Sequence, residues 1–228
     1  MITHAMEDYL KVIFQLEEEE ATVTTQSIAA RLQVQSPSVT NMVKRLAELK
    51  LVKHTPYRGV VLTETGRKAA LEVIRHHRLL ELYLAEALGY AWDEVHDEAD
   101  RLEHSISEEF EARIDRVLGF PRVDPHGDPI PTAEGEIADF VGLRLSELED
   151  GERAVIERVS DSDPEKLRYL GNMGLYPAAA VEVVEQMPFE GPVRIQVDDD
   201  EHVLGRDLAR TIRVRRSSEH DRANGDHA

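Results

Sequence analysis

The chain has 228 residues, with 27 Lys or Arg against 45 Asp or Glu, so its formal net charge is -18. This length predicts one or two domains with a buried core. The absence of cysteine excludes a disulfide scaffold, a thiolate metal site and a cysteine nucleophile. No stretch is apolar enough to cross a membrane, and the first twenty residues lack the pattern of a signal peptide. We therefore expect a cytoplasmic protein that does not associate with a membrane.

The acidic composition has two interpretations, and the distribution of charge helps to separate them. Only six of the 27 basic residues are Lys, which is typical of a protein from a halophile; the alternative is an acidic protein that avoids nucleic acid. Residues 22–70, however, hold eight Lys or Arg and only two acidic residues. A basic segment inside an acidic chain is typical of a protein that binds phosphate backbones, although charge alone also fits a solvated face without a partner.

Within this basic segment the pattern predicts a helix-turn-helix. Thr25 lies near the start of a first short helix, and Ser36 and Pro37 fit the cap and first residue of a second. The second helix buries Val39, Met42, Val43, Leu46 and Leu49 at helical spacing. The expected DNA contacts are Thr25, Ser36, Pro37, Ser38, Thr40, Asn41, Lys44, Arg45 and Arg58. We expect the base edges to be read by Ser38, Thr40 and Asn41, and the phosphates to be bound by Lys44, Arg45 and Arg58.

Two short strands are expected next, over residues 51–54 and 59–62, on either side of a turn that contains Arg58. A helix-turn-helix followed by such a hairpin is a winged helix. Winged helices bind DNA in most cases, and some bind proteins instead.

Two helices, over residues 65–88 and 93–118, are expected downstream and carry candidate metal ligands. His77 and Glu81 are four residues apart and share a helix face. A second set at helical spacing consists of His96, Asp100, Glu103 and His104. Mixed imidazole and carboxylate donors suit divalent metals, but an acidic helix also acquires such spacings by chance.

Residues 6–135 resemble the diphtheria toxin repressor family of metal-dependent transcriptional regulators. The matching stretches are residues 6–10, 28–32, 36–40, 62–66, 77–81, 95–100, 103–104 and 125–131. The resemblance implies a regulatory metal site made by Asp8, Asp100, Glu103 and His104, and an ancillary site made by His77, Glu81 and His96. It also implies a homodimer that binds palindromic double-stranded operator DNA when Mn2+ or Fe2+ is bound, with two metal sites per subunit possible.

Two departures from the family pattern bear on the choice of metal. Oxygen donors at Asp8 and Asp100 favour Mn2+. Manganese-responsive members with a binuclear centre tend to carry a further carboxylate one turn after the position of Asp8, where this chain has Lys11. We expect Mn2+ first and Fe2+ next.

The last third of the chain predicts a small β domain. Short strands are expected over residues 152–159, 181–185, 193–197 and 211–214, with a helix over 164–170. The glycine-rich stretch after that helix resembles an SH3-like β-barrel of iron-transport-associated proteins; a phosphate loop is the competing idea, but no GK[ST] occurs. In some relatives this domain lends ligands to the ancillary site, for which Asp163 and Glu165 are the nearest candidates.

Taken together, the sequence predicts a mainly α protein with a small β domain. Residues 1–70 form the winged helix-turn-helix, 71–140 the helical dimerisation and metal-binding domain with a Pro-rich linker from about 121, 150–216 the SH3-like domain and 217–228 a disordered tail. The function predicted is a metal-dependent repressor of metal-ion homeostasis genes, not an enzyme. The alternatives are a winged-helix regulator that answers to a non-metal ligand and, far less supported, a metallohydrolase.

Overall fold

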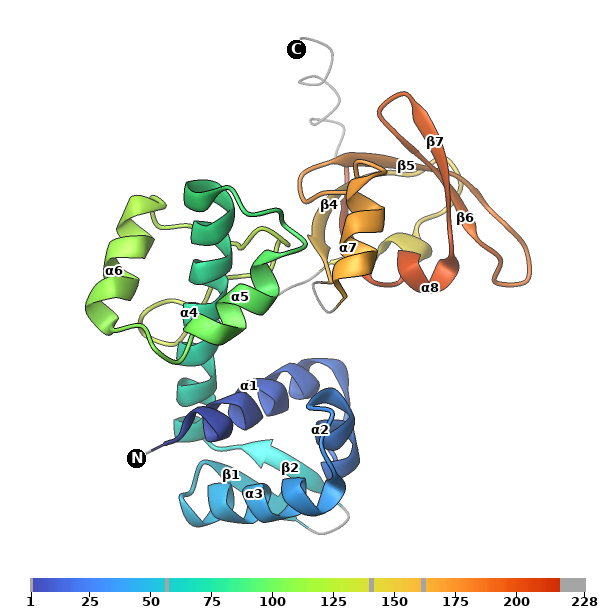
Figure 1. Ribbon diagram of the computed structural model, residues 1–228. Helices are drawn as coiled ribbons and strands as arrows, with labels where there is room; N and C mark the ends of the chain where they lie inside the picture. The colour runs from blue at the N-terminus through green and yellow to red at the C-terminus, as the bar shows by residue number, and fades with distance from the viewer. Residues whose placement is uncertain (1, 56–57, 140–141, 161–162, 218–228) are drawn as a thin grey trace. The chain divides into compact units, whose positions relative to one another are not determined.

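The computed structural model describes residues 2–55, 58–139, 142–160 and 163–217. These residues divide into two compact units, each with its own core: Met1–Leu80, Ala99–Phe120 and Ile130–Ala138 form the first, and Glu81–Glu98, Pro121–Pro129 and Asp139–Ala228 form the second (Figure 1). The tail predicted to be disordered lies outside the described residues, apart from Ser217. No helix in the described part of the chain is long and apolar enough to span a bilayer.

The first unit begins with the predicted winged helix, which the structure confirms. Its elements are α1 (His4–Glu19), α2 (Thr25–Arg31), α3 (Ser36–Glu48), β1 (Val52–Thr55) and β2 (Gly59–Leu62), followed by α4 (Glu64–Leu88). The strands β1 and β2 pair antiparallel, and the core between helices and wing contains Leu10, Ile13, Ile28, Val39 and Leu46 (Figure 1). The apolar residues at helical spacing therefore do build one buried face, although Leu49 at the end of α3 is exposed.

The first helix of the motif begins at Thr25, where its start was predicted, whereas the second begins one residue earlier than predicted. Thr24 caps α2, because its side chain accepts a hydrogen bond from the Ser27 backbone N–H while the Ser27 hydroxyl accepts one from the Thr24 N–H. Gln35 precedes the first residue of α3, so Ser36 and Pro37 both lie in its first turn. Proline is tolerated there because its missing N–H would have no partner within the helix.

The prediction of a single helix over residues 93–118 is wrong. The structure has two helices, α5 (Val95–Leu102) and α6 (Glu108–Val117), separated by a turn that contains Glu103 and His104. The break follows from Ser107, whose hydroxyl accepts the Phe110 N–H and so begins a new helix. The two candidate ligands Glu103 and His104 therefore lie just beyond a helix end and not on a helix face.

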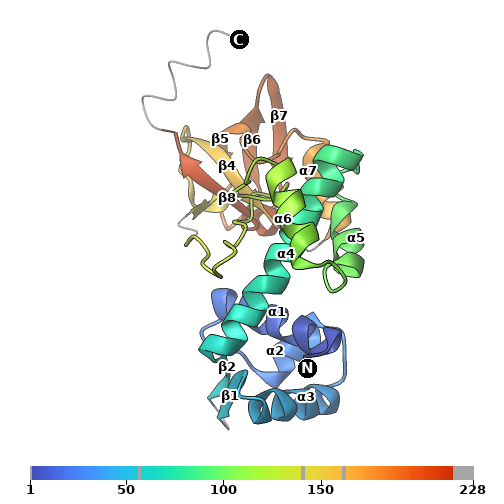
Figure 2. The same cartoon turned by 90° about the vertical axis from the view of Figure 1, so that its left-hand side faces the viewer.

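The second unit contains the C-terminal β domain, with one six-stranded antiparallel sheet in the order β3-β8-β4-β5-β6-β7. Its elements are β3 (Leu143–Arg144), β4 (Arg153–Val159), α7 (Pro164–Gly171), β5 (Ala180–Gln186), β6 (Val193–Val197), β7 (Asp200–Leu204), α8 (Arg206–Ala209) and β8 (Ile212–Arg216). Figure 2 shows β8, β4, β5 and β6 as neighbours in this sheet. The SH3-like fold is confirmed, but the predicted closure into a barrel is wrong, because β3 and β7 are the two edges of an open sheet.

At Gly66 the start of α4 packs closely against the backbone of Leu51, which directly precedes β1. A Cβ atom added to Gly66 would lie 1.9 Å from the Leu51 carbonyl oxygen, which also accepts the Thr63 N–H. Backbone atoms cannot move aside as a flexible side chain would, so any side chain at this position forces the wing and the helix apart.

We expect Gly66→Ala to lower the free energy of unfolding by about 1–3 kcal/mol, even though alanine favours a helix. Urea unfolding followed by circular dichroism measures this loss. Gly205→Ala is the matched control, because Gly205 has ordinary backbone angles and nothing within 4 Å of the added Cβ. Equal stability of the two variants would contradict the close packing of the wing.

Two candidate metal centres

The first centre lies in the first unit, where α1 meets the turn after α5. Asp8 on α1 places Oδ1 2.7 Å from His104 Nε2, and Glu103 Oε1 lies 3.4 Å from the same nitrogen. Ligand atoms of these three residues all lie within 4.8 Å of one another. Two carboxylates and an imidazole converging in this way can hold a divalent cation, which would take the place of the Nε2 proton.

The imidazole of His104 is held in place from its other side. The Glu7 carboxylate lies 2.7 Å from His104 Nδ1, and the ring of His4 stacks on the His104 ring with centroids 4.9 Å apart. A histidine that donates Nδ1–H to a carboxylate while Nε2 faces other donors is the usual arrangement of a metal-binding histidine. Sequence reasoning missed both Glu7 and His4, although His4 lies four residues before Asp8 on α1, so its helical spacing was an available signal.

Lys11 lies beside this centre, and two carboxylates and one imidazole surround its ammonium group. Its Nζ donates to Glu103 Oε2 at 2.8 Å and to Asp100 Oδ1 at 2.9 Å, and lies 3.1 Å from His77 Nδ1. Burial lowers the pKa of Lys11, but the charges of Glu103 and Asp100 raise it by more, so the pKa lies above the usual value. The pKa values of Asp100 and Glu103 are raised by burial and lowered by more through their contacts with His77 and Lys11, so both lie below the ordinary range.

The four predicted regulatory ligands are therefore distributed over two positions. Asp8, Glu103 and His104 converge, whereas Asp100 directs Oδ1 to Lys11 and to His77 Nδ1, 3.2 Å away. A regulatory site that also includes Asp100 stays a prediction.

A buried polar network fixes the turn that carries these ligands. The His76 ring lies 3.1 Å from the Glu103 backbone oxygen through Nδ1 and 3.0 Å from Glu111 Oε2 through Nε2. Arg75 pairs with Glu111 and Asp115 on α6 and donates to the Pro131 carbonyl at 2.7 Å. This network connects α4, α6 and the backbone of Glu103, so the turn has little freedom to move.

A second centre, in the second unit, combines Glu81, Asp124 and His126. Ligand atoms of the three residues lie within 4.8 Å of one another, and all three are buried. His126 Nε2 is 2.7 Å from the Trp92 carbonyl oxygen, and a carbonyl can only accept, so Nε2 carries the proton. His126 Nδ1 faces Glu81 Oε2 at 3.9 Å and has no hydrogen-bond partner among the described residues. A buried imidazole lone pair beside carboxylates is a place where a metal ion fits.

The loop that carries His126 belongs to the segment expected to be a Pro-rich linker, which stays a prediction, and within it the structure describes an ordered turn. Asp124 closes the loop, because its Oδ1 accepts the backbone N–H groups of His126 and Asp128. The loop is attached to β4: the Val159 N–H donates to the His126 carbonyl, and Arg158 pairs with Asp128 at 2.7 Å. Gly127 has φ +88 and packs its Cα on the Glu157 carbonyl, where no side chain would fit.

Sequence reasoning named Glu81 as a ligand but missed Asp124 and His126. The available signal was the Asp-x-His spacing of Asp124 and His126 at the start of the matching stretch 125–131. It was missed because the Pro and Gly content of this segment is typical of a linker. Of the predicted ancillary set, His96 Nδ1 lies 3.1 Å from Glu81 Oε1, while His77 contacts Glu103 and Lys11 in the first unit. The set of His77, Glu81 and His96 stays a prediction.

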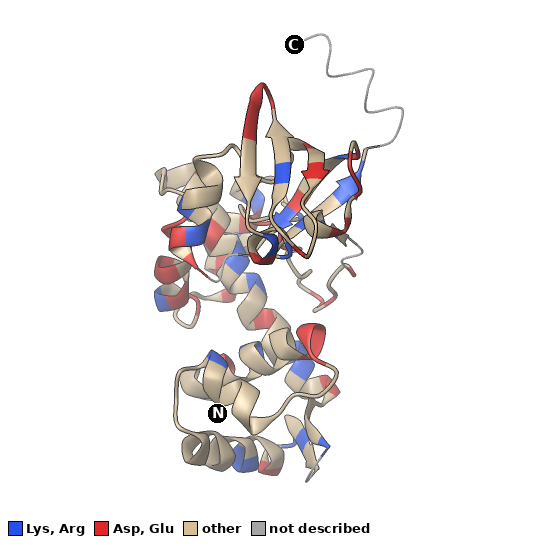
Figure 3. Cartoon of the chain, turned by 90° about the vertical axis from the view of Figure 1, so that its right-hand side faces the viewer, with Lys and Arg blue, Asp and Glu red and all other residues tan. Residues whose placement is uncertain are grey.

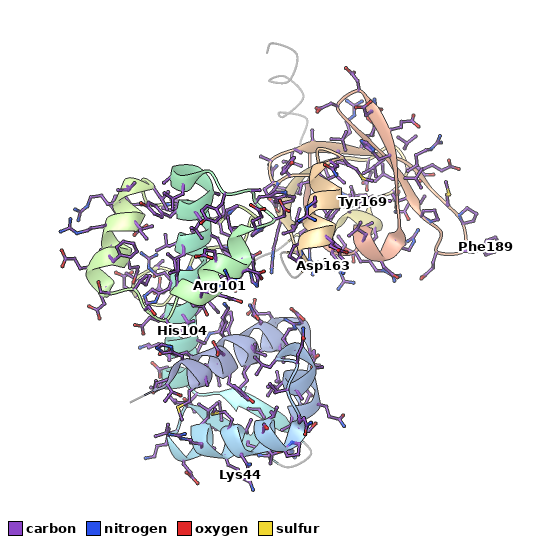
Figure 4. All side chains as sticks on the ribbon, viewed as in Figure 1. Lys44, Arg101, His104, Asp163, Tyr169 and Phe189 are labelled. Atoms are coloured by element: carbon purple, nitrogen blue, oxygen red, sulfur yellow. The ribbon has the colours of Figure 1, made fainter. Side chains whose placement is uncertain are left out.

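The extra ligands suggested for the C-terminal domain have other contacts. Asp163 caps α7, where its Oδ1 accepts the backbone N–H groups of Glu165 and Lys166, and it pairs with the Lys166 ammonium. Figure 4 shows Asp163 at the start of α7. Asp163 and Glu165 as ligands therefore stay a prediction, with helix capping as the contact that the structure describes for Asp163.

The candidate DNA-binding face is the outer side of α3. Ser36, Pro37, Ser38, Asn41, Lys44 and Arg45 are all exposed there, and Figure 4 shows Lys44 pointing away from the domain. α3 contains the basic residues Lys44 and Arg45 and the acidic residue Glu48, and Figure 3 shows both colours of charge on this helix. Thr40 differs from the rest, since its hydroxyl donates to the Ser36 carbonyl at 3.0 Å.

One metal-ligand candidate, Asp8, lies on the first helix of a winged helix, and the others, Glu103 and His104, lie in the turn after α5. This combination defines a metal-responsive DNA-binding regulator. Comparison with known proteins agrees. Residues 1–60 match the iron dependent repressor N-terminal DNA binding domain, 63–132 the iron dependent repressor metal binding and dimerisation domain, and 143–216 the FeoA domain. The chain belongs to the iron-dependent repressor family and is a metal-dependent transcriptional repressor, not an enzyme.

Individual relatives cover nearly the whole chain. The iron-dependent repressor IdeR of Mycobacterium leprae is 36% identical over 222 residues, covering 91% of this chain and 95% of its own length. The diphtheria toxin repressor of Corynebacterium glutamicum is 34% identical over 219 residues, covering 91% and 94%. Among solved structures, a manganese-dependent transcriptional repressor in complex with manganese has 40% identity and a TM-score of 0.87, covering 93% of this chain and 100% of its own.

We expect His126→Ala to reduce the amount of Mn2+ bound at saturation by one ion per subunit, because the cluster of Glu81, Asp124 and His126 loses its imidazole. Equilibrium dialysis followed by elemental analysis measures this number. His202→Ala, on β7 and outside both clusters, should bind as much as the unmodified protein. Unchanged binding in His126→Ala would show that the second cluster holds no metal.

Proposed function

We propose that this repressor uses Mn2+ as its co-repressor, with Fe2+ as the next candidate. The ligands proposed for the regulatory site are Asp8, Asp100, Glu103 and His104. We propose further that the metal-bound homodimer binds a palindromic operator and controls genes of metal-ion homeostasis.

The observation that carries the proposal is the meeting of Asp8 with Glu103 and His104. Asp8 belongs to α1, which packs in the core of the winged helix, whereas Glu103 and His104 follow α5. A cation bound to all three supplies a strong electrostatic link between these segments. Asp8 then holds the winged helix in one orientation, and Glu103 and His104 hold the metal-binding domain to it. With a free metal concentration 100 times Kd, this linkage favours the bound state by about 3 kcal/mol.

The donor chemistry favours Mn2+. Both clusters offer only carboxylate oxygens and imidazole nitrogens, and the chain has no cysteine to provide a softer thiolate. Oxygen-rich sites suit Mn2+, while Fe2+ accepts the same donors. The printed names of the relatives include both iron-dependent and manganese-dependent repressors, which supports either ion.

Dimerisation would place two copies of α3 on adjacent half-sites. Residues 102–120 of the first unit expose four large apolar side chains to water, namely Leu102, Phe110, Val117 and Phe120. They lie within the segment that matches a dimerisation domain, which supports this face as the dimer contact. A two-fold dimer reads inverted half-sites, so fixing the winged helix also fixes the distance between recognition helices.

We expect Asp8→Asn to weaken Mn2+-dependent binding to the protein's own promoter DNA by about 10–100-fold or more, because it removes a ligand charge. Fluorescence anisotropy with Mn2+ or anaerobic Fe2+, in both molar and dilute salt, measures it. Asp97→Asn on the exposed face of α5 is the matched control and should behave as the unmodified protein. DNA binding that ignores metal in all three proteins would favour a winged-helix regulator with a non-metal ligand.

We expect truncation of Lys44 and of Asn41 on α3 to change DNA binding in different ways. Lys44→Ala should weaken binding to specific and unrelated DNA alike and reduce the slope of log K against log salt by about 1. Asn41→Ala should cost about 1–3 kcal/mol on the operator only. Competition binding over a salt series distinguishes the two. Loss of specificity in Lys44→Ala would reverse the assigned roles.

A further inference from the structure

Lys11 places a permanent positive charge among groups that are themselves metal-ligand candidates. It lies on α1 three residues after Asp8, and its side chain is only 10% exposed. Its ammonium nitrogen contacts Asp100 Oδ1, Glu103 Oε2 and His77 Nδ1 at 2.9, 2.8 and 3.1 Å. Two carboxylates and an imidazole around one cation are the same kinds of donor that form the neighbouring centre.

Glu103 connects the two positions, because each of its oxygens serves a different one. Oε1 faces His104 Nε2 at 3.4 Å, on the side of Asp8. Oε2 lies 2.8 Å from the Lys11 ammonium and 2.6 Å from His77 Nδ1. The carboxylate of Glu103 therefore bridges two cation positions: the regulatory position between Asp8 and His104, and the position that the Lys11 ammonium fills.

We propose that Lys11 acts as a built-in second cation, which restricts the regulatory centre to one metal ion per subunit. The proposal rests on the proposed function, because it takes Asp8, Glu103 and His104 as metal ligands. Without the ammonium, the donors of Asp100, Glu103 and His77 would surround an opening beside the first ion, with a shared carboxylate. The Lys11 ammonium, carried by α1, already satisfies these groups through hydrogen bonds and charge, so a second ion would have to displace a charged side chain.

A second consequence concerns the metal-free protein. Buried Glu103 carries its charge whether metal is present or not, and the ammonium offsets part of that charge at all times. Lys11 thereby provides one link between α1 and the turn after α5 through Glu103, and the regulatory metal adds a second link through Asp8 and His104. The residue is a positioning residue for the first centre and an obstacle to a second ion beside it.

The test compares variants of Lys11 in the full-length protein by the number of Mn2+ ions bound. Lys11→Glu replaces the ammonium with a carboxylate and should bind one more Mn2+ per subunit than the unmodified protein. Lys11→Arg keeps the positive charge and should show no gain. Lys11→Glu combined with His77→Ala should lose the gained ion, because His77 would be one of its ligands. Equilibrium dialysis with elemental analysis gives the number, and the second centre contributes equally to every variant.

Electron paramagnetic resonance provides an independent readout. Two Mn2+ ions that share the Glu103 carboxylate are magnetically coupled, so in Lys11→Glu the isolated-ion signal of the regulatory centre should disappear and only that of the second centre should remain. Lys11→Met removes the ammonium without adding a carboxylate, so it should bind the additional ion more weakly than Lys11→Glu. This variant still tests the proposal if Lys11→Glu does not fold.

The outcomes separate the two proposals. If the unmodified protein and Asp8→Asn bind the same number of Mn2+ ions, the proposed regulatory site is overturned. Normal binding by the unmodified protein, with no additional ion in either Lys11→Glu or Lys11→Met, would overturn the role of Lys11 alone. A gain in Lys11→Arg equal to that in Lys11→Glu would show that the charge of Lys11 does not limit the number of ions.

Discussion

A buried carboxylate needs a positive charge nearby, and this requirement organises the first unit. Glu103 is only 2% exposed, and it lies between the Lys11 ammonium on one side and the imidazole of His104 on the other. Removing a charge from water is costly, and the cost is offset only when partners and hydrogen bonds are well placed. The network of Arg75, His76 and Glu111 holds the backbone of Glu103 so that these partners stay in reach. Through Lys11, Glu103 therefore helps to hold α1, together with the contacts of Asp100 with Lys11 and of His104 with Asp8.

Much of the fold follows from local patterns, whereas closure and helix breaks do not. The winged helix was predictable because Pro37 marks a helix start and Val39, Val43 and Leu46 repeat at helical spacing. The break between α5 and α6 was missed because Glu103 and His104 continue the helical spacing of Asp100, so periodicity alone cannot show that Ser107 starts a new helix. The open sheet was missed because strand patterns do not tell which edges pair.

The candidate sites were predictable to different degrees for a physical reason. Asp8 was named through family resemblance, which carries information on contacts between distant segments, whereas Glu103 and His104 were also found from their spacing to Asp100. Asp124 and His126 lie in a stretch whose Pro and Gly content is typical of a linker, and only the hydrogen bonds of the Asp124 carboxylate turn it into a fixed loop. Distant contacts of this kind leave no periodic signal in a single sequence.

The attachment of the His126 loop to β4 has a consequence for how this protein can be divided. Arg158 and the Val159 N–H, both on β4, contact Asp128 and the His126 carbonyl, and Gly127 packs on Glu157. A chain that stopped before residue 143 would retain Glu81, Asp124 and His126 in its sequence and lose the strand that holds two of them in place. Removal of the C-terminal domain would therefore also remove the contacts that hold the His126 loop. During evolution, loss of that domain would have removed the support of a metal-ligand cluster along with it, without a single change in the cluster's own residues.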